Sequence, residues 1–396
     1  MERKYMDVNI ANVITIAIMV LFVSTVPVVS AKDNIGEHTN HKIIDHSIKQ
    51  GLIYLNDSQL SNGQFPSYIS DSPNMNDGRY IPLLFDTTFI AHTLNLAADT
   101  YPNEMEQKMR KKTVDYLLEN REKHGVWRIY GKSNTFFPPD TDDTAMAFSA
   151  IVESGETIND ESLDYILNFR SPEGVFNLQI TDDEWLDPNS PLYAFFKMDI
   201  YDAVVNADIL YANSLRNRNP EGVVKYLNNI TKNKAFLNGT IFYPSPYVYS
   251  YVITKAYSEG GVKDLQPSIG TLKQYMLSTQ KPDGSWGNDL DSALATAALL
   301  NIGYEGKSID KAIKHIIGEQ NENGSWDAYA FYSGPVFDPS YFGSPELTTS
   351  FNIEALIKYN QKHNEPNEEK KTHEREEKHN HKYKSHEGDR EQDVEN

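Results

Sequence analysis

Apolar residues in the middle of the chain recur at the three- and four-residue spacing of amphipathic helices, and these stretches end in similar ways. Apolar pairs close to such ends are Leu117–Leu118, Ile166–Leu167 and Met276–Leu277. A glycine follows each pair and an aromatic residue follows the glycine. Glycine supplies the positive φ that ends a helix, and the ring can lie over the next unit. The pattern predicts a series of short helices joined by similar turns.

These units are repeats of one another. The two clearest copies are 275–286 (YMLSTQKPDGSW) and 315–326 (HIIGEQNENGSW). Weaker copies end at Phe65, Trp127 and Phe176, and a degenerate sixth lies around 226–236. Self-similarity at an interval of this size indicates a repeat architecture in which successive units stack on each other.

A second pattern follows each turn: an acidic residue, then small and apolar residues at helical spacing. It is seen at 86–91, 143–147 and 291–295, with variants at 202–206 and 346–350. An acid in the first turn favours the start of a helix, and small residues let helices approach closely. Six pairs of an outer and an inner helix within 32–360 leave about 55 residues per pair, enough for two helices and their loops. The sequence therefore predicts an all-α fold.

The two ends of the chain differ from this core. Arg3 and Lys4 precede an apolar run, 13–29, and Val29-Ser30-Ala31 offers small residues for cleavage before Lys32. We expect 1–31 to be a signal peptide, or else an uncleaved anchor, and either places the protein outside the cytoplasm. We expect the folded domain over 40–360 and a disordered charged tail over 361–396, which has too few apolar side chains to fold.

Composition excludes several classes of function. Lys and Arg number 37 against 56 Asp and Glu, so the net charge is 37 − 56 = −19 and nucleic acid is not an expected partner. The chain has no cysteine, which excludes thiolate nucleophiles, zinc fingers and iron–sulfur clusters. No phosphate-binding loop or metal-ligand helix is present, and we predict no cofactor and no metal. Four tail histidines could hold a metal weakly, but a solvated tail is the simpler interpretation: His373, His379, His381 and His386.

The pattern Gln-x-x-x-Gly-x-Trp at Gln280…Trp286 and Gln320…Trp326 resembles the glutamine–tryptophan repeat of the terpenoid cyclase and protein prenyltransferase superfamily. The resemblance spans nearly all of 43–360. It implies an (α/α)6 toroid built from six helix-pair repeats. Prenyltransferases bind zinc through a cysteine and complement-type domains form a thioester with one, so a chain without cysteine is most similar to the class II terpene cyclases.

One motif carries candidate chemistry. Pro139 is followed by Asp140-Thr141-Asp142-Asp143-Thr144-Ala145, which is similar to the Asp-x-Asp-Asp-Thr-Ala signature of class II cyclases. The resemblance implies that Asp142 donates a proton to an alkene, with Asp140 and Asp143 as hydrogen-bonded supports. Clustered carboxylates can hold such a proton, because like charges a few ångströms apart cannot all ionise.

The same motif would also make a good helix start, with Asp140 as the cap. Asp143 matches Asp86 and Asp291 in other repeats, whereas no such match is expected for Asp140 and Asp142. The helix start therefore accounts for Asp143 alone, and the cluster remains a candidate functional centre.

Further residues are candidates for substrate binding. Asp202 and Asn206 stand four apart on one helical face, and aromatic clusters at 193–196, 242–251 and 329–342 include Tyr247, Tyr249 and Tyr341. Such rings can stabilise carbocations or stack on sugars. We expect the acidic stretch 182–187 to be a solvated loop, and His92 to be a satisfied core residue.

Three functions are compatible with the sequence. The first is an exported cyclase-like enzyme, an isomerase or lyase acting at Asp140–Asp143 on a small-molecule or lipid polyprenyl substrate. It would allow peripheral membrane association and need no obligate protein partner. The second is a secreted sugar-active lyase or hydrolase on the same fold, and the third is a noncatalytic binding module. A deep apolar pocket ending at Asp142 favours cyclisation, whereas a wide tyrosine-lined groove favours a glycan.

Overall fold

The computed structural model describes residues 37–335 and 340–364, with side chains from residue 41 to residue 363 outside the gap. The chain divides into two units, 1–42 and 43–396, and the second contains the helical domain. The predicted signal segment 1–31 and the tail from residue 365 onward lie outside the described residues. Helix α14 continues to Asn364, beyond the domain end predicted at residue 360.

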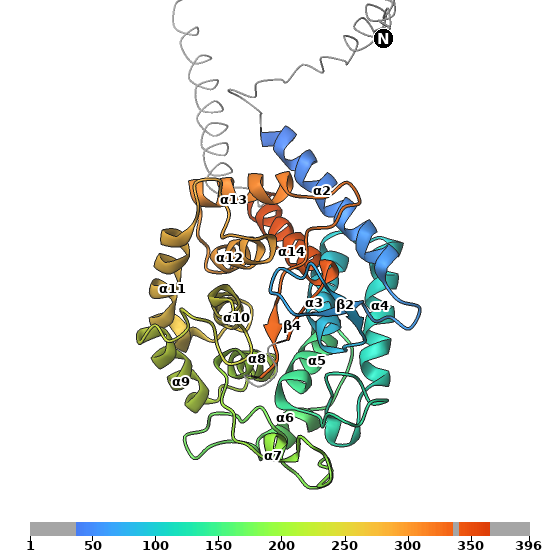
Figure 1. Cartoon of the computed structure of the whole chain (residues 1–396). Coiled ribbons are helices and arrows are strands. Elements are labelled where there is room, and N and C mark those ends of the chain that lie inside the picture. The colour runs from blue at the N-terminus through green and yellow to red at the C-terminus, as the bar shows by residue number, and fades with distance from the viewer. Residues whose placement is uncertain (1–36, 336–339, 365–396) are drawn as a thin grey trace, which may run out of the picture. The chain divides into compact units, whose positions relative to one another are not determined.

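Six helices form an inner ring (Figure 1). They are α3 (Phe85–Thr100), α5 (Thr141–Glu153), α8 (Ala203–Ser214), α10 (Pro246–Ser258), α12 (Asp289–Asn301) and α14 (Pro345–Asn364). Each packs against the next in chain order, and α14 packs against α3, so the ring is closed. Alanine, serine and threonine recur along these helices and are buried, which allows their close approach.

An outer helix precedes each inner one. The outer helices are α2 (Glu37–Ser58), α4 (Glu104–Glu119), α6 (Glu161–Ile166), α9 (Glu221–Lys232), α11 (Gln266–Thr279) and α13 (Lys307–Gly318). They bury one face and expose the other, as the amphipathic spacing predicts. A short helix, α7 (Tyr193–Phe196), and two 3₁₀ turns, η1 (Lys123–Gly125) and η2 (Lys263–Leu265), lie in the connections. The predicted all-α toroid of six helix pairs is confirmed.

One small antiparallel sheet pairs segments that lie far apart in the chain. It joins β1 (Ser67–Ser70), β2 (Arg79–Ile81), β3 (Tyr332–Ser333) and β4 (Tyr341–Gly343) in the order β2-β1-β4-β3. In register, Tyr68 lies opposite Gly343 and Ile69 opposite Phe342. The sheet thus ties the loop after α2 to the loop before α14 and brings both to one end of the inner ring.

The repeat turns hold the rings as expected. Trp127, Trp286 and Trp326 are buried. Each indole Nε1 donates to a carbonyl of the preceding outer helix, on Leu117, Met276 and Ile316, at 2.7, 2.8 and 2.7 Å. At Gly284 the φ is +97°, and an added Cβ would come within 2.4 Å of the Lys311 carbonyl of the next outer helix. The glycine therefore permits both the turn and the close approach.

Contacts between the first and last helices close the domain. The Asn360 amide donates to Asp45 Oδ1 at 2.7 Å. Gly51 lies against the side chain of Ile353, which a Cβ at that position would meet at 2.9 Å. The predicted contact between the segments near 44–54 and 351–359 is confirmed. Among the described residues, none of the helices has the length and apolar character needed to cross a membrane.

Candidate active site

The start of each inner helix can be aligned through one recurring hydrogen bond. The backbone N–H of the ring residue in the turn donates to a polar side chain in the first turn of the inner helix. The pairs are Phe65 to Thr87 (3.1 Å), Trp127 to Thr144 (3.2 Å), Phe176 to Asn206 (2.8 Å), Trp286 to Ser292 (3.0 Å) and Trp326 to Thr349 (3.1 Å). This bond sets a common register for five of the six repeats.

In that register, the residue two positions before the acceptor is buried in every repeat. It is Phe85, Asp142, Val204, Leu290 and Leu347 in the five copies. Asp142 is therefore the one ionisable residue at a position that is otherwise apolar. Burying a carboxyl group here costs stability and does not serve the repeat. This asymmetry marks Asp142 as the residue that the fold does not require.

Asp140 has a structural role. It is the N-cap of α5, and its Oδ1 accepts from the Asp143 backbone N–H at 2.7 Å. Asn288 caps α12 in the same way, accepting from the Asp291 N–H at 2.8 Å. The expectation that Asp140 has no counterpart in the other repeats is thus wrong, because Asn288 holds that position. The pairs Asp140–Asp143 and Asn288–Asp291 are equivalent, and Asp142 stands alone.

Asp142 is held in place by one hydrogen bond. Its side chain lies at the first turn of α5 and is buried, with 6% of the residue exposed. Oδ2 accepts from the Tyr243 hydroxyl at 2.6 Å. Oδ1 is buried and has no hydrogen-bond partner among the described residues. One oxygen is therefore oriented by the protein while the other is left without a partner.

The surroundings of Asp142 favour its neutral form. Burial raises its pKa well above the usual range, and the nearby carboxyls of Asp208 and Asp140 raise it further. The Tyr243 hydrogen bond acts in the opposite direction. Burial likewise raises the pKa of Asp140 to about 6 and that of Asp143 well above its usual range. Within the described part of the chain, no lysine or arginine forms an ion pair with these three aspartates.

A cavity of about 190 Å³ opens beside these aspartates, and all three line it. Nine of its twenty lining residues are aromatic: Phe85, Tyr130, Phe137, Phe195, Phe196, Phe242, Tyr243, Tyr332 and Phe342. The segments that supply them lead into or lie at the starts of inner helices, so the cavity lies at the N-terminal end of the inner ring. A mostly apolar space with a carboxyl group of raised pKa in its wall suits an apolar ligand.

The aromatic clusters seen in the sequence supply six of these rings: Phe195, Phe196, Phe242, Tyr243, Tyr332 and Phe342. The other three, Phe85, Tyr130 and Phe137, were not singled out in the sequence. Asp208 was also missed, although an acid within the apolar α8 segment was a visible signal. It is buried, and burial raises its pKa well above the usual range.

The five residues predicted to bind substrate do not line this cavity. Asp202 caps α8, accepting from the N–H of Val204 at 2.7 Å. Asn206 accepts from the N–H of Phe176, as one of the recurring repeat bonds. Both have structural roles that the sequence did not distinguish from binding.

The three tyrosines have other partners. Tyr247 stacks on Tyr275 with ring centroids 5.6 Å apart, and Tyr249 donates to the Leu227 carbonyl at 2.8 Å. Tyr341 lies in β4, opposite Ser70. Their assignment to the substrate stays a prediction that this cavity does not support. The stretch 182–187, by contrast, is mostly exposed, as expected.

A second polar cluster occupies the opposite end of the inner ring. His92 Nδ1 lies 2.8 Å from Glu153 Oε2, and Lys358 Nζ lies 2.5 Å from Glu259 and 2.6 Å from Glu354. Here acids face bases. Burial opposes ionisation of Glu153, but His92 and Lys255 outweigh it and lower its pKa to about 2. Burial lowers the pKa of His92, but Glu153 and Glu354 raise it more, to about 9.

Solved structures of other proteins share this architecture. The type II terpene cyclase MstE from Scytonema, in complex with geranylgeranyl dihydroxybenzoate, has a TM-score of 0.64 and 16% identity. The match covers 82% of this chain and 99% of that one. MstE in complex with merosterolic acid A gives a TM-score of 0.66. This chain shares its fold with the type II terpene cyclase MstE.

Two further proteins are similar to this chain. Drimenol cyclase of Aspergillus calidoustus is 24% identical over 200 residues, which is 50% of this chain. The match spans only about a third of that enzyme's length, 34%. A possible member of the GH105 family from Salmonella enterica has a TM-score of 0.51 and 13% identity, with 85% of this chain and 97% of that one covered. No protein-family model matches the chain.

Proposed function

We propose that the protein catalyses the cyclisation of a polyprenyl substrate, started by proton transfer from Asp142. One observation carries the proposal: a buried aspartic acid replaces the apolar residue of the repeat where it borders an aromatic cavity. A proton donor to an alkene must be a carboxylic acid that keeps its proton in the empty site. The burial of Asp142 and the carboxyl groups beside it both favour the protonated form.

The proposed step is a transfer of one proton. Because Oδ2 accepts from Tyr243, the proton resides on Oδ1, which has no other partner among the described residues. The terminal alkene of the substrate takes this proton to form a new C–H bond and a tertiary carbocation, and Asp142 becomes a carboxylate. Internal alkenes then attack the cation in turn. Loss of a proton from the last cation, or addition of water, ends the sequence, and Asp142 regains a proton from solvent.

Tyr243 has a positioning role in this scheme. Its hydroxyl donates to Asp142 Oδ2 and stabilises the carboxylate once the proton has left. The same hydrogen bond lowers the pKa of Asp142, against the larger effect of burial. The acid is thereby made stronger while it remains protonated in the empty cavity.

The aromatic wall suits the cationic intermediates. The faces of Phe and Tyr rings attract cations, most strongly where water is excluded. The six phenylalanines in the wall offer no hydroxyl that could trap a carbocation: Phe85, Phe137, Phe195, Phe196, Phe242 and Phe342. The wall also holds Gln179 and Ser333, but its apolar residues outnumber its polar ones, and this composition favours an apolar substrate over a sugar. The MstE complexes hold a geranylgeranyl compound and its product, which is consistent with this substrate class.

We also propose that the protein is exported. The support is in the sequence, where positive charge, an apolar run and the small residues Val29-Ser30-Ala31 follow one another before Lys32. A lipid-soluble polyprenyl compound at the membrane surface would then be an accessible substrate. Sequencing the N-terminus of protein recovered from cells tests this proposal. A mature chain that begins near Lys32 supports cleavage and export, whereas Met1 on membrane-bound material supports an anchor.

Product analysis in D₂O tests the cyclisation directly. The purified protein is incubated with polyprenols and polyprenyl-aromatic compounds of several lengths, and in parallel with polysaccharides. We expect a cyclic isomer or its hydrate from a polyprenyl compound, with one deuterium at the carbon that receives the first proton. Asp142→Asn should lower the yield of this product by orders of magnitude. Turnover of a polysaccharide that survives Asp142→Asn would overturn the proposal in favour of a sugar-active enzyme, and no turnover of either class would favour a binding module.

A further inference from the structure

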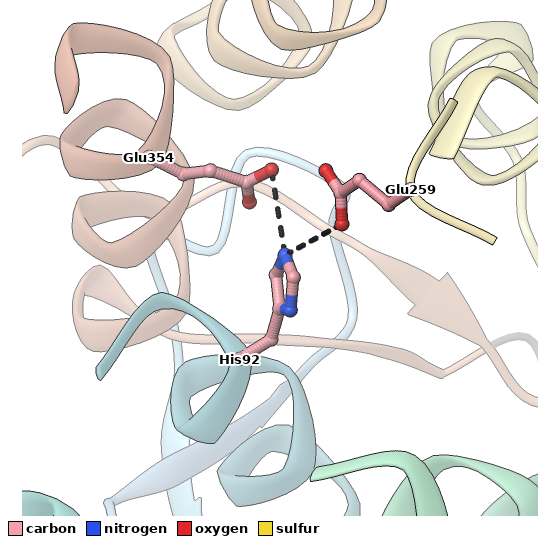
Figure 2. Close-up of side chains that lie close together, drawn as sticks. All are labelled: His92, Glu259 and Glu354. Atoms are coloured by element: carbon pink, nitrogen blue, oxygen red, sulfur yellow. Dashed lines mark ion pairs between the residues drawn. The ribbon is translucent and has the colours of Figure 1, made fainter. Parts of the chain in front are cut away.

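The far end of the inner ring holds three potential metal ligands from three segments. His92 lies on α3, Glu354 on α14, and Glu259 follows directly after α10. Figure 2 shows His92 Nε2 pointing between the two carboxylates. The three ligand atoms lie within 4.8 Å of one another. His92 and Glu354 are buried, whereas Glu259 reaches the surface, which offers an entry path from solvent.

The distances around His92 Nε2 do not fit a hydrogen-bonded pair. Nε2 is 3.7 Å from Glu259 Oε2 and 3.7 Å from Glu354 Oε1, beyond the 2.7–3.2 Å or so of an N–H···O bond. Nε2 is also buried and has no hydrogen-bond partner among the described residues. Two ligand atoms on one tetrahedral metal ion lie about 3.4 Å apart, given bonds of about 2.1 Å. Each histidine–carboxylate distance therefore needs to shorten by only a few tenths of an ångström for one ion to bridge the pair, and the three ligand atoms lie within 4.8 Å of one another.

The other ring nitrogen is arranged as in metal-binding histidines. Nδ1 lies 2.8 Å from Glu153 Oε2, and Glu153 Oε1 accepts from the Tyr211 hydroxyl. A ligating histidine commonly donates its second N–H to a carboxylate, which fixes the ring and makes the other nitrogen a better ligand. Glu354 is oriented in a similar way, since its Oε2 accepts from the Tyr251 hydroxyl at 2.9 Å.

A metal ion has to displace the proton of His92, whose pKa is raised to about 9, and once His92 is neutral the charges of this cluster leave one negative charge to be balanced. Glu153, Glu259 and Glu354 face Lys255 and Lys358, so three acids meet two lysines. Lys358 is the main competitor of a metal ion, since its Nζ contacts Glu259 Oε1 and Glu354 Oε1. It leaves Glu259 Oε2 free, and each carboxylate oxygen has two lone pairs, so Lys358 and a metal ion can share Glu354.

We propose that His92, Glu259 and Glu354 bind one divalent transition-metal ion, of the Zn²⁺ class. One imidazole and two carboxylates form a donor set that suits such ions. Mg²⁺ prefers oxygen ligands alone, so the imidazole disfavours it. The ion would tie α3, α10 and α14 together at the end of the ring away from Asp142. The proposal is independent of the cyclisation chemistry.

Thermal unfolding of the full chain with Zn²⁺ tests the site, with Mg²⁺ as the matched control. An ion bound to the folded domain raises Tm, whereas an ion bound only to histidines outside it does not stabilise the fold. After treatment with a chelator, we expect Zn²⁺ to raise Tm in a saturable way and Mg²⁺ to leave it unchanged. His92→Asn keeps an amide that can donate to Glu153 but removes Nε2, and it should abolish the Zn²⁺-dependent rise.

Two further measurements make the test decisive. Metal analysis after gel filtration should find one more Zn²⁺ per chain in the unmodified protein than in His92→Asn. Glu153→Gln should lower the apparent Zn²⁺ affinity about 10–100-fold, because it replaces the carboxylate that accepts a hydrogen bond from the ligating histidine. Should His92→Asn fail to fold, Glu259→Gln at the surface carries the same prediction. An equal Tm rise in the unmodified protein and the variant, no rise in either, or an equal rise with Mg²⁺ would overturn the site.

Discussion

The two ends of the inner ring treat buried carboxyl groups in opposite ways. At the N-terminal end, Asp140, Asp142 and Asp143 face one another and a tyrosine hydroxyl, and their pKa values are raised. At the C-terminal end, Glu153 and Glu354 face lysine and histidine, and their pKa values are lowered against the effect of burial. Each end holds both buried and half-buried carboxyl groups, with Asp142 buried and Asp140 half-buried at one end, and Glu354 buried and Glu153 half-buried at the other. Burial alone therefore does not decide the outcome.

The identity of the neighbours decides it. A buried acid without a cation holds its proton, and a buried acid beside a cation gives it up. One end therefore has carboxyl groups of raised pKa beside a mostly apolar cavity, and the other end has a network of ion pairs that joins helices. The inner helices supply both groups, so the candidate catalytic residues and the ion pairs that join the helices lie at opposite ends of the same ring.

The largest effect should come from removing the acidic proton at Asp142. We expect Asp142→Asn to lower the rate of product formation by about 10²–10⁴-fold, because the amide keeps the shape but cannot act as a general acid. Steady-state product analysis measures this. Asp291→Asn is the matched control: Asp291 is half-buried at the start of α12 but lies outside the cavity lining, and the variant should retain turnover. Equal losses in both variants would make the effect structural.

At the opposite end, Lys358→Met should destabilise the fold and leave the chemistry intact. It removes the cation between Glu259 and Glu354, and breaking a buried ion pair from one side costs about 3–5 kcal/mol. Denaturant unfolding measures this loss. Lys111→Met, which removes an exposed pair with Asp115, should leave the unfolding midpoint unchanged. A Lys358→Met protein as stable as its parent would show that the network does not hold the ring together.

Asp142→Asn should increase stability at neutral pH, by about 1–3 kcal/mol, although it removes activity. The folded-state pKa of Asp142 lies above its unfolded value, so its favourable contribution is present at low pH and is lost as pH rises towards the folded pKa. The gain should therefore shrink as pH falls towards about 4, near the unfolded pKa of aspartate. Chemical denaturation of both proteins across this range measures the difference. A loss of stability at neutral pH would mean that the fold needs Asp142.

The smallest effect is expected at Asp140. Asp140→Asn should change the free energy of unfolding by less than about 0.5 kcal/mol, because Asn is an equally good cap and Asn288 already caps α12 in this way. Asp140→Ala should cost about 0.5–2 kcal/mol, because the Asp143 N–H loses its acceptor. Both values come from denaturant unfolding. A large loss in the asparagine variant would mean that the charge of Asp140, not its cap, matters.

The repeat made the fold predictable from the sequence. The turns before Trp127, Trp286 and Trp326 mark the ends of outer helices, and each acid-led segment marks the start of an inner one. These are local patterns, and local patterns fix where helices begin and end. The small sheet was not predicted, because its longest strand has four residues and its pairing partners lie far apart in the chain.

The site was only partly predictable. The motif at 140–143 pointed to Asp142, but separating it from Asp140 required the hydrogen-bond register that equates Asp140 with Asn288. A capping residue and a ligand look alike in a sequence, so the binding role predicted for Asp202 and Asn206 stays a prediction beside the structural roles that they have. Phe85, Tyr130 and Phe137 were missed because a cavity is a property of packing between distant segments. The cluster at His92 was missed for the same reason.

The protonation state of Asp142 tests the central claim most directly. ¹³C NMR titration of a protein labelled at the aspartate side-chain carboxyl carbons would follow it, with the signal assigned by its absence in Asp142→Asn. We expect Asp142 to keep its proton at neutral pH in the empty protein. We also expect Tyr243→Phe to raise the pKa of Asp142 further, because the Tyr243 hydrogen bond lowers it. A carboxyl that is already ionised at neutral pH and titrates like an exposed aspartate would contradict the account.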